Sequence, residues 1–219
     1  MIAGPHECPS MTQPPTLTSL PLFPLGTVLF PGGLLPLRVF EVRYLDMVRK
    51  CRQAGTPFGV VALTEGHEVR RAGVPEERFH DIGTLAAIDQ LQTPQPGLLT
   101  LRCHGTQRFR ILRRSLLPHG LWIADAQPLP DDAPVALPPD LAPLATALAR
   151  MQAALRERGA DLPGNMPGDM PADCGWVANR WCELLPAPLE FRQRLMALDN
   201  PLLRLELVGD LLTRSGMLS

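Results

Sequence analysis

Few residues of this chain have the types and spacing that catalysis requires, and lysine is the clearest case. Twenty of the 21 basic residues are arginine, so Lys50 is the only lysine among 219 residues. A phosphate-binding P-loop needs a glycine-rich turn that ends in Lys followed by Ser or Thr, because the lysine meets the terminal phosphates. Lys50 lies instead in an amphipathic stretch, with no serine near it in the sequence. These residues therefore offer neither a P-loop ATPase site nor a Ser–Lys hydrolase dyad.

Cysteine and histidine supply only weak catalytic candidates. The G-x-S-x-G pattern of a nucleophile elbow is absent from the sequence. Cys103 and His104 are adjacent, but neighbours on a strand point to opposite faces, so we interpret Cys103 as a core thiol. His67 and His80 flank a polar segment and are interpreted as surface histidines. An enzyme that uses Cys103 or His80 is our least favoured hypothesis, and we predict no catalytic residue.

The five cysteines give no sign of a metal site or of a disulfide framework. They are irregularly spaced and odd in number: Cys8, Cys51, Cys103, Cys174 and Cys182. Zinc sites use closer ligand pairs than Cys174 and Cys182, which are eight residues apart, so we predict no metal and no cofactor. The first 19 residues lack the basic and apolar regions of a secretory signal, and no run approaches the ~20 apolar residues of a membrane span. We expect free thiols in a cytoplasmic protein, with a flexible leader over residues 1–19 and Met11 as an alternative start.

A basic segment over residues 90–124 contains no Asp or Glu. Its cationic side chains are Arg102, Arg108, Arg110, Arg113 and Arg114, with His104 and His119. Arg108 and Arg110 are predicted to share one strand face near Trp122, and basic residues beside an aromatic side chain can bind nucleic acid. Because acidic residues balance basic ones over the whole chain, we favour a solvated face or a face that docks on the acidic second part.

The first part of the chain has the pattern of short strands with one helix. Apolar stretches bounded by Pro, Gly or polar residues predict strands near 20–23, 58–63, 82–91, 99–103, 109–111 and 122–126. Gly105-Thr106 is predicted to turn the chain, which would make a hairpin of the fourth and fifth of these strands. Between the first two, Tyr44, Met47, Val48 and Cys51 follow a helical period that ends at Gly55, whereas residues 64–80 look like a loop. Six or so short strands predict a small antiparallel barrel without free edges.

The second part has helical periodicity and the opposite charge. Helices are predicted near 141–155, 176–185, 189–198 and 200–216, the last with Asn200 as N-cap before Pro201. We predict a barrel over 20–128, a proline-rich connector over 129–140 and a helical bundle over 141–216. Residues 20–128 carry a net charge of +4 and residues 129–219 a net charge of −4, and this attraction would help the two parts dock.

Three blocks of the sequence resemble the N-terminal substrate-recognition domain of the ATP-dependent protease Lon. The first block is LPLFPLGTVLFPGGLLPLRVFEVRYLDMV at 20–48, the second is DIGT at 81–84 continuing to Ile88, and the third is GTQRFRI at 105–111. The stretch LLRLE at 202–206 is similar to the last helix of that domain. The resemblance covers about residues 20–214 and implies a PUA-like pseudo-β-barrel followed by a helical bundle, in the α+β class. The ATPase and Ser–Lys protease domains of full-length Lon find no counterpart in these residues.

The resemblance implies a non-catalytic module that binds unfolded or tagged polypeptides and that could serve a separate ATP-dependent protease. Apolar candidates for contact with a peptide are Phe30, Leu35, Tyr44, Trp122, Trp176 and Trp181. For each of them, packing in the core is the competing interpretation. The alternative function is RNA binding through Arg102, Arg108 and Arg110, since PUA-like barrels elsewhere bind RNA. The sequence leaves the oligomeric state open.

Overall fold

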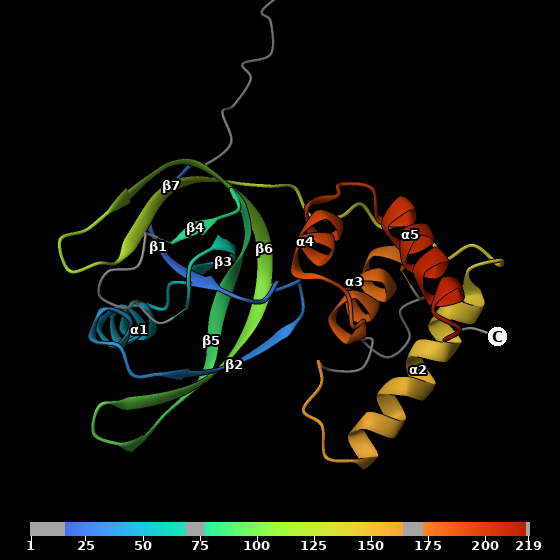
Figure 1. Cartoon of the computed structure of the whole chain (residues 1–219), viewed down its shortest axis with the longest axis horizontal. Helices are drawn as coiled ribbons and strands as arrows, with labels where there is room; N and C mark the ends of the chain where they lie inside the picture. Colours follow the sequence, from blue (N-terminus) through green and yellow to red (C-terminus); the bar gives the residue numbers. More distant parts are fainter. Residues whose placement is uncertain (1–15, 69–76, 164–172, 218–219) are drawn as a thin grey trace, which may run out of the picture.

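The computed structural model describes residues 16–68, 77–163 and 173–217, in which a β-barrel is followed by a group of helices (Figure 1). The strands are β1 (Leu17–Leu25), β2 (Leu34–Val39), β3 (Phe58–Glu65), β4 (Arg78–Phe79), β5 (Ile82–Gln95), β6 (Leu98–Leu116) and β7 (Trp122–Pro128). The helices are α1 (Val42–Ala54), α2 (Ala142–Glu157), α3 (Cys174–Leu184), α4 (Leu189–Ala197) and α5 (Pro201–Arg214). The predicted α+β class, with one early helix and a C-terminal helical bundle, is confirmed.

The barrel is closed by a parallel pair of strands and is therefore uneven. Strands β1, β7, β6, β5 and β3 are antiparallel neighbours in this order, and the ring closes where β3 runs parallel to β1. Strand β2 pairs with β6 outside the ring, and β4 pairs with β3. The expectation of a barrel without free edges was thus too simple, because several strands keep an edge that no other described strand occupies.

The predicted turn at Gly105-Thr106 is wrong, since β6 runs without interruption from Leu98 to Leu116. Gly105 lies where a side chain has no room: a Cβ there would be 2.2 Å from the carbonyl oxygen of Phe30. Two main-chain hydrogen bonds join the segments, from Gly32 to the Gly105 carbonyl at 2.8 Å and from Gly105 to the Gly33 carbonyl at 2.9 Å. A glycine inside a strand here marks the close approach of another backbone, which sequence patterns do not distinguish from a turn.

Helix α1 packs on the barrel by the predicted face. Tyr44, Met47, Val48 and Cys51 are all buried, and the Tyr44 ring stacks on Phe23 with 4.0 Å between ring centroids. The helix ends at Gly55, whose φ of 64° is a left-handed C-cap that glycine adopts without steric cost. This packing leaves Lys50 and Asp46 at the surface.

A buried ion pair fixes the start of α1 against the barrel. Arg43 donates to the Glu77 carboxylate at 3.1 Å and to the Gly120 carbonyl at 2.8 Å, and the Trp122 indole lies 3.3 Å from the second carboxylate oxygen of Glu77. Burial alone would raise the pKa of Glu77, but hydrogen bonds from its own backbone, Arg43 and Trp122 hold this pKa below its usual value. For Arg43, burial opposes the charged form, but the neighbouring Tyr44, Glu41 and Glu77 raise its pKa overall.

The helices are joined to the barrel by a second, larger network of buried charges. Asp132, from the proline-rich segment between β7 and α2, accepts hydrogen bonds from Arg108 of β6 and from Arg204 of α5. The two arginine residues are 3% and 1% exposed. Arg108 also donates to the Met196 carbonyl at 3.0 Å, and Arg204 donates to Asn179 at 2.9 Å. One carboxylate thus links the barrel, the connector and the bundle.

Some parts of the predicted organisation fall partly outside the described residues. Of the predicted leader, residues 1–15 are not described, and β1 already begins at Leu17. Of the predicted loop 64–80, residues 69–76 are not described, while Arg78 and Phe79 form the short strand β4. No helix in the described ranges is long and apolar enough to cross a membrane.

Asp132→Asn is expected to lower the free energy of unfolding by about 3 kcal/mol, because it leaves buried Arg204 without a counter-charge and buried Arg108 with only the exposed Asp199, 3.3 Å away. Urea denaturation followed by tryptophan fluorescence measures this change. Asp131→Asn is the matched control, since Asp131 is exposed. Equal loss of stability in both variants would contradict the role of Asp132.

Glu77→Gln is expected to cost about 1–2 kcal/mol at pH 7 through the weakened contact with buried Arg43. A carboxyl group with a depressed pKa stabilises the fold above its unfolded pKa, and this contribution is lost as the pH falls through the folded pKa. The stability difference between wild type and variant should therefore shrink on acidification below about pH 4. Denaturation curves at several pH values test this, with Glu65→Gln, which removes an exposed pair with Arg78, as a control expected to change little.

Candidate functional site

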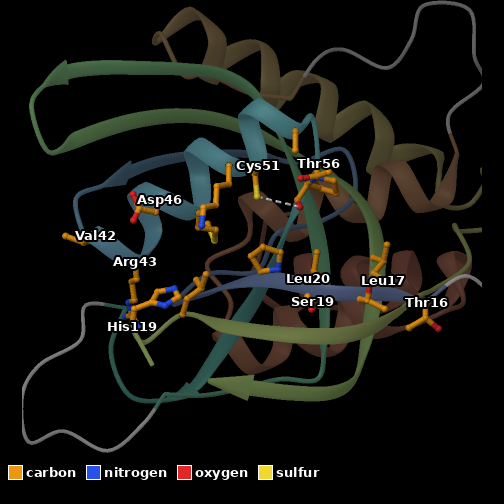
Figure 2. Close-up of a pocket in the computed structure, with 17 residues that line it drawn as sticks. Thr16, Leu17, Ser19, Leu20, Val42, Arg43, Asp46, Cys51, Thr56 and His119 are labelled. Atoms are coloured by element: carbon orange, nitrogen blue, oxygen red, sulfur yellow. Dashed lines mark hydrogen bonds between the residues drawn. The ribbon is translucent and has the colours of Figure 1, made fainter. Parts of the chain in front are cut away.

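A groove of about 830 Å³ lies between α1 and the first half of β1 (Figure 2). One wall is the stretch from Thr16 to Pro21, and the other is the side of α1 from Val42 to Ala54. His119 lies with Arg43 at one end, and Thr56 lies toward the other. Its volume is in the usual range for binding sites in proteins. Helix α1, which forms one wall of the groove, lies on the side of the barrel away from the bundle (Figure 1).

The groove has an apolar floor and few available charges. Its apolar lining includes Leu20, Met47, Cys51 and Leu121. Val42, at the end of the α1 wall, is 73% exposed, and Phe40 is 54% exposed two residues before it. Of the charged residues in the lining, Arg43 is paired with Glu41 and Glu77, Asp46 lies 3.6 Å from Arg49, and Lys50 lies at the surface.

The cysteine of the groove is not activated as a nucleophile. Its cysteine, Cys51, is buried, and burial raises the pKa of this thiol, which keeps it in the unreactive protonated form. Its Sγ lies 3.9 Å from the Pro57 carbonyl. Among residues 16–68, 77–163 and 173–217, no group of three or more His, Cys, Asp or Glu side chains comes together that could hold a metal ion.

The apolar residues predicted to contact a peptide lie almost entirely in the core. Phe30, Leu35, Tyr44, Trp122 and Trp181 are buried, and Trp176 is half-buried. In this arrangement they have little or no surface to offer a ligand, and their contact with a peptide stays a prediction.

The residues of the groove itself were missed by the sequence reasoning. The available signal was Val42, an apolar residue outside the buried face of α1 that follows another apolar residue, Phe40. The first residues of β1, which line the groove, pair with β7 on one edge and with β3 only from Leu22 onward. This open edge leaves no trace in the residue pattern, because pairing depends on the path of other strands.

The three arginines of the nucleic-acid alternative have different surroundings. Arg108 is buried between barrel and helices, whereas Arg102 pairs with Asp161 at 2.9 Å. Arg110 is exposed beside a small hollow of about 230 Å³ that Glu190 and Arg194 also line. The structure therefore does not gather them on one open surface, and RNA binding stays a prediction.

The residues considered for catalysis are also held in other roles. Cys103 is fully buried, and burial raises its pKa to about 12. His80 lies 3.0 Å from the Glu190 carboxylate of α4, and His104 lies 2.6 Å from Asp89. Cys51, Cys103, Cys174 and Cys182 are all buried free thiols.

Comparison with known proteins identifies the fold and the family. A solved structure described as a Lon N-terminal domain protein from Xanthomonas campestris is 36% identical, with a TM-score of 0.68, and the match covers 89% of this chain and 98% of that one. The N-terminal domain of a Mycobacterium avium complex Lon protease has the same fold at 18% identity, with a TM-score of 0.54 over 88% of this chain and 96% of that one.

Curated relatives are much longer than this chain. A Lon protease of Anaeromyxobacter dehalogenans is 24% identical over 97% of this chain but only 26% of its own length, and that of Flavobacterium johnsoniae is 28% identical over 49% of this chain and 13% of its own. Residues 19–214 match the family described as the ATP-dependent protease La (LON) substrate-binding domain. The chain therefore belongs to the Lon substrate-binding domain family.

Proposed function

We propose that this chain binds segments of unfolded polypeptides in the groove between α1 and β1. The family's substrate-binding domain is a non-catalytic module. The observation that carries the proposal is the groove itself, which has an apolar floor and an exposed Val42 at its end. Folded proteins keep most of their large apolar side chains buried, so an apolar groove selects chains that have lost or not yet reached their fold.

The groove would recognise the polypeptide, and catalytic domains of the Lon type, on this protein or on a separate one, would carry out proteolysis. A bound segment would be held in the groove and passed on unchanged. We place the module in the cytoplasm, where the thiols of Cys51, Cys103, Cys174 and Cys182 stay reduced.

Val42→Asp is expected to weaken the binding of a permanently unfolded protein about tenfold, because it removes roughly 1.5 kcal/mol of apolar burial in the complex. Asp at the first residue of a helix is favourable, so the fold should be unaffected. Fluorescence anisotropy with labelled, reduced and carboxymethylated α-lactalbumin measures the affinity. Leu112→Asp is the matched control, since Leu112 is 56% exposed on β6 and outside the groove. Equal affinities of both variants would refute the assignment of the surface.

The single lysine provides a second test of position. An amine-reactive cross-linker should join the bound polypeptide to Lys50, which lines the groove. The double variant Arg49→Lys/Lys50→Arg moves the amine to a neighbouring exposed position that does not line the groove, and the yield of conjugates should fall several-fold. Peptide mapping by mass spectrometry locates the conjugates, and an unchanged yield would place the polypeptide elsewhere.

A further inference from the structure

We infer that the groove takes its occupant by strand addition: an extended polypeptide segment pairs its main chain with the free edge of β1 and packs its side chains under α1. This inference rests on the proposed function, and it adds how the segment is held and why its sequence matters little. Three features of the described residues carry it.

The first feature is an unpaired strand edge that faces the groove. Within the described part of the chain, β1 from Leu17 to Pro21 pairs with β7 on one edge only. Its other edge is occupied by β3 from Leu22 onward. Thr56 and Pro57 connect the end of α1 to the start of β3, and both of these residues line the groove. Unpaired amides and carbonyls along such an edge form a template for another extended chain.

The second feature is the match in length between the two walls. The stretch from Thr16 to Pro21 spans about 17 Å as a strand. The stretch of α1 from Val42 to Ala54 spans about 18 Å as a helix. A segment of about five extended residues therefore fits along the full groove, with β1 on one side and α1 on the other.

The third feature is the lack of charge along the open edge. The stretch TLTSLP at 16–21 contains no charged residue, whereas proteins commonly protect strand edges with lysine or other charges. Its proline, Pro21, lies at the end of the open stretch. A bulge between Leu17 and Leu20 includes Ser19, whose φ is 53° and whose amide donates to Asp125 at 3.2 Å. The Ser19 amide is thus already satisfied, and pairing would use its neighbours.

By contrast, the free edge of β5 is partly covered. Beyond Ala86, no described strand pairs with β5 on the side of β3, but Arg52 of α1 donates to the Ile88 carbonyl there at 2.9 Å. The β5 edge at Ala87 and Ile88 lines a hollow of about 240 Å³, whereas the β1 edge lines the groove of about 830 Å³ with its apolar floor. Alternate side chains of an added strand would reach this floor, and the others would point to solvent.

Main-chain methylation of a bound peptide tests the inference directly. The probe is a fluorescein-labelled decapeptide in which leucine alternates with serine, with one N-methyl group placed at each position in turn. An added strand turns every second amide toward β1, so methylation should weaken binding about tenfold at alternate positions and little at the others. Fluorescence anisotropy with the full chain measures each affinity.

The outcomes separate the inference from the proposed function. A period of two in the methylation series supports strand addition. Equal effects at all positions, with the peptide still cross-linked to Lys50, overturn strand addition and leave the proposed function in place. If the unmethylated peptide neither binds nor cross-links to Lys50, the proposed function fails as well.

Amide hydrogen exchange by NMR examines the protein side of the same contact. Saturating peptide should slow exchange at least tenfold for one or more of the amides of Thr16, Leu17, Thr18 and Leu20. The exchange rates of the amides of Gln90 and Gln92, in the part of β5 that pairs with β6, should be unchanged. Protection at β5 with none at β1 would overturn the inference.

Discussion

The structure depends on one shared carboxylate at the junction of its two parts. Asp132 bonds to the buried guanidinium groups of Arg108 and Arg204, which come from a barrel strand and from the last helix. Burying two cations is costly unless each is paired and its remaining donors are used. Carbonyls at Leu195, Met196 and Leu198 accept those donors, so the turn from α4 to α5 is folded around the arginines. The bundle is thereby held on one side of the barrel, and the opposite side is left to α1 (Figure 1).

The same constraint explains the distribution of charge along the chain. The barrel part carries an excess of arginine and the second part an excess of acid, and contacts between them follow this sign. Arg108 lies 3.3 Å from Asp199 and Arg102 lies 2.9 Å from Asp161. Exposed pairs such as the one between Arg102 and Asp161 contribute little to stability. The buried network around Asp132 contributes most of the specificity with which the bundle docks on the barrel. Electrostatic attraction thus acts at the junction, whereas the groove keeps few free charges.

Sequence periodicity predicted most elements because local burial decided them. The spacing of Tyr44, Met47, Val48 and Cys51 predicts α1 and its buried face, and Gly55 predicts where it ends. Gly105 shows the limit: the same residue type serves a turn or a close approach of two backbones, and only the path of residues 30–33 decides between them.

The candidate site lay beyond such local signals for the same reason. The β1 wall of the groove is open because β3 pairs with β1 only from Leu22 onward. This pairing joins strands that are far apart in the chain, so no local pattern reports it. Asp132, in a segment interpreted as a connector, carried no pattern that predicted its role. Large aromatic residues attracted attention, but their size favours the core, whereas Val42, an apolar residue off the buried helical face, is exposed at the end of the groove.

An open strand edge is a hazard as well as a binding site, and the position of α1 reconciles the two. An edge that is fully exposed invites pairing with the sheets of other copies, which leads to aggregation. Here the helix stands along the edge, held by Arg43 and by the stacking of Tyr44 on Phe23. In the proposed strand addition, a single extended chain would enter between helix and strand, and α1 would stand in the way of a folded sheet with its neighbouring layers. Selection for the unfolded state would then come from shape, before any side chain of the segment is recognised.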